Sequence, residues 1–150
     1  MVARRAATIR EFDHTADIGL EIRAGSPAGV FEAAAVGMFR LVVRRGRPSG
    51  RPGRTHVSRL TLEAPDLPGL LIAWLRELLY RFTGDHIVLT DFRVERFTER
   101  PGKASLVARV HGRPLDPRDR VLREIKAVTY HAATVEKTPR GYLGRVIFDV

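Results

Sequence analysis

The sequence predicts an α+β fold in which two helices pack on a mostly antiparallel β-sheet. Two stretches repeat apolar residues at helical spacing, and each opens with a capping residue and a proline in the first turn. Around them, shorter runs alternate apolar and polar residues as half-buried strands do, and turn sequences join the later runs as hairpins. The elements form two loosely similar strand–helix–strand units without a sequence repeat or a linker, so we expect one domain over residues 1–150.

Cap and turn residues set the expected boundaries. Ser26 opens the first helix, which should end near residue 43, and Asp66 opens the second, which Gly84 should close. Trp74 lies in the apolar stripe of the second helix, so we interpret it as a core residue. The expected strands cover residues 8–12, 18–23, 57–63, 87–97, 105–110, 124–135 and 143–150.

Composition excludes several classes of protein. The chain has no cysteine, which removes disulfides, thiolate metal ligands and cysteine nucleophiles. Its five histidines are scattered without the spacing of a zinc site. The apolar runs are too short for a transmembrane helix, and the N-terminus lacks the apolar segment of a secretory signal. We therefore expect a cytoplasmic protein with no membrane partner.

The charge is strongly basic, and arginine carries most of it. Lys and Arg total 26 against 17 acidic residues, which gives a formal net charge of +9. Such a charge favours a nucleic-acid partner, although a codon bias towards arginine explains part of it. The segment from Arg44 to Arg54 is a loop of Arg, Gly and Pro that could bind RNA or an acidic protein face. Because it has no aromatic residue for base stacking, we favour a solvated loop.

Carboxylates stand at both ends of the sequence. Asp13 and Asp17 occupy a short polar break between the first two strands, and Asp149 is followed by Val150 with its α-carboxylate. If the last strand pairs beside the first, three side-chain carboxylates could meet in an oxygen cluster of the kind that binds Ca²⁺. On spacing alone, turn stabilisation by Asp13 and Asp17 and a solvated end at Asp149 are the favoured explanations.

Lys126 and His131 stand on the late strand expected over residues 124–135. Alternation along a strand puts them on opposite faces, so they could face the same way only if the strand contained a bulge. A single site that uses both side chains is therefore not expected.

Four segments, in this order, resemble motifs of the archease family, and the match covers nearly the whole chain. They are FDHTADIG at residues 12–19, WLRELL at 74–79, IKAVTYH at 125–131 and VIFDV at 146–150. The resemblance implies a protein cofactor of the GTP-dependent tRNA-splicing RNA ligase, which promotes guanylylation of the ligase histidine and multiple turnover. Such a cofactor is not an enzyme by itself.

The same resemblance implies site residues. A divalent metal site, with Ca²⁺ as the expected ion, would use Asp17, Asp149 and Val150, while Lys126 would act in ligase activation. Asp13, His14 and His131 lie within matched motifs without an assigned role. The identity of the metal stays open, because Ca²⁺, Mg²⁺ and Mn²⁺ all accept carboxylates.

Two other functions remain as alternatives. The chain could be a basic RNA-binding module that delivers RNA through the segment from Arg44 to Arg54, which predicts steeply salt-dependent RNA binding. It could also be a small metal-dependent phosphoester hydrolase built on the same carboxylates, although the sequence shows no paired general base.

Overall fold

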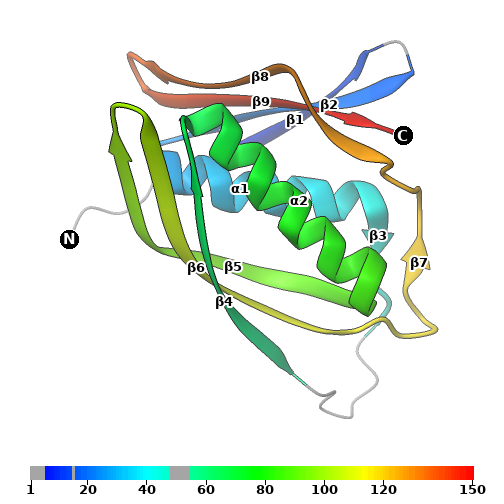
Figure 1. Cartoon of the computed structure of the whole chain (residues 1–150). Helices are drawn as coiled ribbons and strands as arrows, with labels where there is room; N and C mark the ends of the chain where they lie inside the picture. Colours follow the sequence, from blue (N-terminus) through cyan, green and yellow to red (C-terminus); the bar gives the residue numbers. More distant parts are fainter. Residues whose placement is uncertain (1–5, 15, 48–54) are drawn as a thin grey trace.

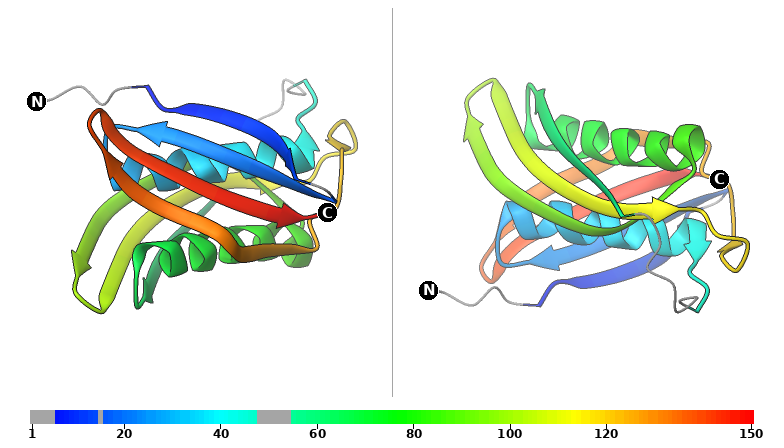
Figure 2. Two further views of the ribbon diagram at one scale, coloured as in Figure 1. Left: turned by 90° about the horizontal axis from the view of Figure 1, so that it is seen from above. Right: turned by 90° about the horizontal axis from the view of Figure 1, so that it is seen from below.

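The protein is built from three layers, with two helices between two antiparallel sheets (Figures 1 and 2). The computed structural model describes residues 6–14, 16–47 and 55–150. The helices are α1 (Pro27–Val42) and α2 (Leu67–Asp85), and each of them contacts both sheets. This arrangement confirms the predicted α+β class, with two sheets where one was expected.

The first sheet has four strands in the order β1-β2-β9-β8, and the second has three in the order β4-β6-β5. The strands of the first sheet are β1 (Thr8–His14), β2 (Asp17–Ala24), β9 (Gly141–Asp149) and β8 (Ala127–Thr138). Those of the second are β4 (His56–Ala64), β6 (Lys103–Pro114) and β5 (Ile87–Arg100). A two-stranded ribbon, β3 (Val43–Arg44) with β7 (Arg120–Val121), lies at one end of the molecule.

Both helices begin at the predicted caps. The Ser26 hydroxyl accepts a hydrogen bond from the Gly29 N–H at 3.0 Å, and the Asp66 carboxylate accepts one from the Gly69 N–H at 2.7 Å. The end predicted for α2 was wrong. Its C-cap is His86, a non-glycine residue in the left-handed conformation with φ of 55°, and Gly84 lies inside the helix.

The core lies along the helices, which are buried on two sides because each is covered by both sheets. Trp74 is 0% exposed, and its indole N–H donates to the Phe31 carbonyl at 2.9 Å, which confirms Trp74 as a core residue. Among the described residues, neither helix is long and apolar enough to cross a membrane.

The observed strands differ from the expected ones at their limits. Every long strand that was predicted is present, but most extend further, and β8 begins only at Ala127. The ribbon strands β3 and β7 were missed, because two residues are too few to show alternation. Arg44 therefore belongs to a strand and not to a loop, and residues 48–54 of the predicted arginine loop lie outside the described residues.

A carboxylate holds the ribbon end together. Asp119 accepts two hydrogen bonds from Arg113, at 2.7 and 2.8 Å, and one each from the backbone N–H of Gly46 and of Asp116, at 2.9 and 2.8 Å. Its side chain is only 1% exposed. The hydrogen bonds from Arg113 hold the pKa of the Asp119 carboxyl well below its ordinary value. Asp119 thereby ties β6 to the segment that follows β3.

We expect Asp119→Asn to destabilise the protein by about 3 kcal/mol, because it leaves the Arg113 charge without its partner. Urea unfolding of the variant and the wild type measures the difference. The depressed pKa stabilises the folded state above the ordinary aspartate pKa and loses this effect as the pH falls further. The difference should therefore shrink as the pH is lowered below about 4. Asp85→Asn, at an exposed position, should change stability by less than about 0.5 kcal/mol, and an equal effect of both variants would contradict this role.

Candidate functional site

The strands β2 and β9, which come from the two ends of the sequence, pair side by side in the middle of the first sheet. Their antiparallel register sets Asp17 directly opposite Asp149 at one end of the pair. Side chains directly opposite each other on antiparallel strands share a face, with Cβ atoms about 5 Å apart. The two carboxylates are therefore neighbours, although 131 residues separate them in the sequence.

Burial decides which face the two carboxylates occupy. Leu20 and Phe148 lie in the core at 1% and 0% exposure, so their face of the sheet packs on the helices. Asp17 and Asp149 are an odd number of residues from them and lie on the outer face, where both are half-buried. A pair of carboxylates on one face is a donor set that suits a hard cation, with carbonyls and water as further ligands.

Asp13 does not join this pair. Its partner across the β1–β2 ladder is Ile18, so alternation places it on the inner face, away from Asp17 and Asp149. Among the described residues, no group of three His, Cys, Asp or Glu side chains could hold a metal ion. The predicted meeting of three side-chain carboxylates was therefore wrong. His14 is the last residue of β1, and its backbone is the ladder partner of Asp17.

Lys126 reaches the site through its main chain. Its N–H donates to the Asp149 carbonyl at 2.7 Å, and the next residue, Ala127, is the ladder partner of Asp149. The Lys126 side chain is exposed. It stands just before β8, so the alternation argument, which assumed a strand from residue 124, does not apply to it.

His131 lies in an irregular part of β8. The register shifts between Thr129 and Thr134, and Ala132 has φ of 56°, a left-handed conformation that costs energy for an alanine. The His131 residue is exposed within this irregularity. The strand β8 therefore contains a bulge of the kind that would let Lys126 and His131 face the same way. Strand alternation no longer places their side chains on opposite faces of the sheet.

The opening motif also has a packing role. Phe12 and Gly19 are ladder partners on β1 and β2, and the Phe12 ring lies where a side chain on Gly19 would begin. Arg10 and Arg145 lie over this ring, with guanidinium carbons 5.6 and 4.8 Å from its centroid. Only glycine at position 19 leaves room for the Phe12 ring. Packing therefore accounts for Phe12 and Gly19 in the opening motif, and neither needs a catalytic role.

Glu21 lies among the arginines that surround the Phe12 ring. The sequence did not predict this cluster of charges. Glu21 accepts a hydrogen bond from Arg10 at 3.0 Å and lies 3.6 and 3.7 Å from Arg23 and Arg145. The Arg10 hydrogen bond lowers the pKa of the Glu21 carboxyl below its ordinary value. The sequence shows charged residues alternating along the strands. It does not show which strands pair, and the pairing is what brings these charges together.

The second and third motifs meet on the outside of α2. Arg76 donates to the Val128 carbonyl at 3.1 Å, and its guanidinium lies over the Tyr130 ring, 5.0 Å from the centroid. Tyr130 is 60% exposed, so this contact is on the surface. A helix motif and a strand motif that lie 52 residues apart are thereby fixed to each other, next to the strand that carries the candidate site.

Fold and site together define a class: small α+β proteins in which the second and last strands bring two carboxylates together beside a lysine. The profile of the archease protein family (MTH1598/TM1083) matches residues 10–150. The protein archease of Methanosarcina acetivorans is 40% identical over 139 residues, 92% of each chain. That of Pyrococcus abyssi is 33% identical over 142 residues, 93% of this chain and 96% of the relative. The chain belongs to the archease family.

A solved structure shares the fold. The solution structure of Methanobacterium thermoautotrophicum protein 1598 superposes with a TM-score of 0.75 at 28% sequence identity, covering 95% of this chain and 98% of that one. The resemblance drawn from the four sequence motifs is confirmed.

We expect Asp17→Asn and Asp149→Asn each to weaken Ca²⁺ binding by about tenfold or more, because affinity depends on the number of ligand charges. Isothermal titration with Ca²⁺, Mg²⁺ and Mn²⁺ measures the effect and ranks the ions. Asp13→Asn is the matched control, since Asp13 lies four residues from Asp17 on the other face. Equal weakening by all three variants would show that general charge, and not this pair, determines binding.

Proposed function

We propose that this archease is a cofactor of a GTP-dependent tRNA-splicing RNA ligase, and that it promotes guanylylation of the ligase histidine and multiple turnover. It would act in the cytoplasm as a partner of the ligase and would not catalyse a reaction alone. Family membership supports the class of protein. The observation that carries the proposed mechanism is the register that sets Asp17 opposite Asp149.

In this proposal Asp17, Asp149 and Val150 hold a divalent cation, expected to be Ca²⁺. When bound, such an ion supplies positive charge that stabilises nucleotide phosphates. Both aspartates are half-buried, so solvent screens their attraction for a cation less than it would on an open surface. The pairing of their strands fixes their spacing before any ligand arrives, which avoids an ordering cost on binding.

Lys126 is the residue that we propose to contact the ligase-bound nucleotide. Its backbone is fixed by the hydrogen bond to the Asp149 carbonyl, while its side chain is exposed. An ammonium is a compact point charge that suits a phosphate. Because the anchor is main chain, replacing the side chain should leave the end of the sheet intact.

The test is RNA ligation with substrate in excess, with GTP, divalent metal and the partner ligase. Wild-type protein should convert a single turnover into many, and Asp17→Ala should abolish this gain. Lys126→Ala should reduce the rate of guanylylation, followed with labelled GTP, by about tenfold or more, since one charge-stabilising contact is lost.

Two controls separate this mechanism from simpler effects. Lys137→Ala removes an exposed lysine elsewhere on β8, and Asp13→Ala removes an exposed carboxylate on the other face of the first sheet. Both should stimulate the ligase as the wild type does. Stimulation that survives Asp17→Ala and Asp149→Ala would refute the metal-site mechanism, and phosphoester turnover by the isolated protein would favour the hydrolase alternative.

A further inference from the structure

Arginines gather at the end of the molecule that carries the β3–β7 ribbon. Seven exposed or half-buried arginines lie in two segments, residues 40–47 and 118–123, that the ribbon brings together. They are Arg40, Arg44, Arg45, Arg47, Arg118, Arg120 and Arg123. We call this set the basic end.

The arginines of the basic end differ from those elsewhere in their partners. On the sheet faces, Glu21 and Glu95 lie close to five arginines, and Asp119 is saturated by Arg113 and backbone N–H groups. Within the described part of the chain, no ion pair involves Arg40, Arg44, Arg45 or Arg120. Their charge is therefore not neutralised inside the protein.

The ribbon holds two of these charges against each other. Arg44 and Arg120 are direct ladder partners, and both are exposed. Like charges directly opposite each other on antiparallel strands are destabilising. Two hydrogen bonds stabilise the ribbon. The Asp119 carboxylate accepts one from the Gly46 N–H, and the Leu122 N–H donates the other to the Val42 carbonyl at 2.7 Å. A multivalent anion laid across the ribbon would relieve the repulsion.

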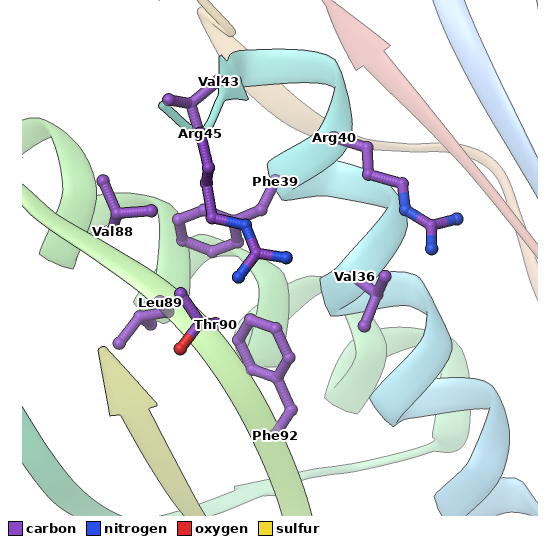
Figure 3. A pocket seen from close by; sticks show the side chains of 9 residues that line it. All are labelled: Val36, Phe39, Arg40, Val43, Arg45, Val88, Leu89, Thr90 and Phe92. Carbon is purple, nitrogen blue, oxygen red and sulfur yellow. The ribbon is translucent and has the colours of Figure 1, made fainter. Parts of the chain in front are cut away.

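A hollow of about 80 Å³ opens beside the ribbon, between the end of α1 and β5. Figure 3 shows the Arg45 side chain extending towards the rings of Phe39 and Phe92, with Arg40 on the neighbouring helical turn. Thr90 lies at a bulge of β5 and its hydroxyl donates to the His111 carbonyl at 3.5 Å, and no carboxylate of a described residue lines this hollow. The guanidinium groups of Arg40 and Arg45, with no acid beside them in this lining, suit a phosphate group.

The basic end and the carboxylate pair lie at the same end of the molecule. The chain terminus, the ribbon and the end of α1 are all on one side in Figures 1 and 2, and the β5–β6 and β8–β9 turns are on the other. Residues 122–126 join the two sites and are tied at each end by a backbone hydrogen bond, to Val42 and to Asp149.

We propose that the basic end binds the phosphate backbone of single-stranded RNA, with Arg44 and Arg120 on the ribbon and Arg40 and Arg45 at the hollow each contacting phosphates. The choice of RNA as the polyanion rests on the proposed ligase function. The buried rings of Phe39 and Phe92 do not offer stacking faces at 6% and 8% exposure, so binding depends on the backbone and not on the bases. RNA bound here would lie close to Lys126 and the carboxylate pair.

Fluorescence anisotropy of a labelled single-stranded RNA, measured over a series of KCl concentrations, tests the proposal. Each phosphate contact contributes about 0.7 to the slope of log affinity against log salt. Arg44→Ala with Arg120→Ala should therefore lower the slope by about 1.4 and weaken binding by about tenfold at low salt. Arg40→Ala with Arg45→Ala should act in the same way. Oligo-U and oligo-C of equal length should bind alike.

The matched control is Arg100→Ala with Arg140→Ala. Both residues are exposed, no ion pair among the described residues involves them, and they lie at the two hairpin turns of the opposite end. Each double variant lowers the net charge of +9 by two. Equal losses in control and test variants, or no RNA binding by the wild type, would overturn the proposal.

Guanylylation of the ligase without RNA separates this proposal from the ligase function. The ribbon variants should stimulate guanylylation normally and fail only when RNA must be ligated. If they lose guanylylation and leave RNA binding unchanged, the basic end contacts the ligase and the RNA proposal is wrong. If Asp17→Ala keeps both RNA binding and guanylylation, the carboxylate mechanism fails while the RNA site stands.

Discussion

The pairing of β2 with β9 is the constraint on which the rest of this structure depends. It joins the two ends of the sequence in the middle of the four-stranded sheet and gives the helices a continuous apolar face. The register is strongly fixed, because a slip of β2 by one residue would turn Leu20 outward and bring Asp17 into the core. Burial of the apolar face therefore sets the position of the polar one. The strand register alone therefore keeps the Asp17 and Asp149 carboxylates next to each other.

Ordinary packing and hydrogen bonds connect the family motifs to the β2–β9 strand pair and to its neighbouring elements. Phe12 needs Gly19 as its neighbour, Arg76 fixes the surface of α2 to the beginning of β8, and Lys126 is held by the carbonyl of Asp149. Each contact joins two segments that sequence comparison treats separately. Together they connect the segments at one end of the molecule, which carries the carboxylates, the lysine and the ribbon arginines, for which no ion pair is found among the described residues. The opposite end carries the β5–β6 and β8–β9 turns and the connections into the two helices.

Local patterns in the sequence predicted the elements that local physics decides. The caps at Ser26 and Asp66 and the core position of Trp74 follow from side-chain chemistry and helical periodicity, so they were confirmed. Asp13 was misplaced because its face depends on ladder register, and the two-residue ribbon strands carry no periodic signal. The end of α2 at His86 was missed because glycine is the usual left-handed residue at a helix end, and Gly84 stands two positions earlier. The metal set and the role of Lys126 remain predictions from family resemblance.

Titration of the ¹⁵N-labelled protein with Mn²⁺, followed by amide NMR, tests the central claim most directly. A paramagnetic ion broadens signals according to their distance from it, so it locates a site without relying on activity. The proposed site predicts that broadening begins at Asp17, Asp149 and Lys126 and spares the β5–β6 and β8–β9 turns at the opposite end of the molecule. Early broadening elsewhere on the surface, or uniform broadening along the chain, would contradict a metal site built by the β2–β9 pair.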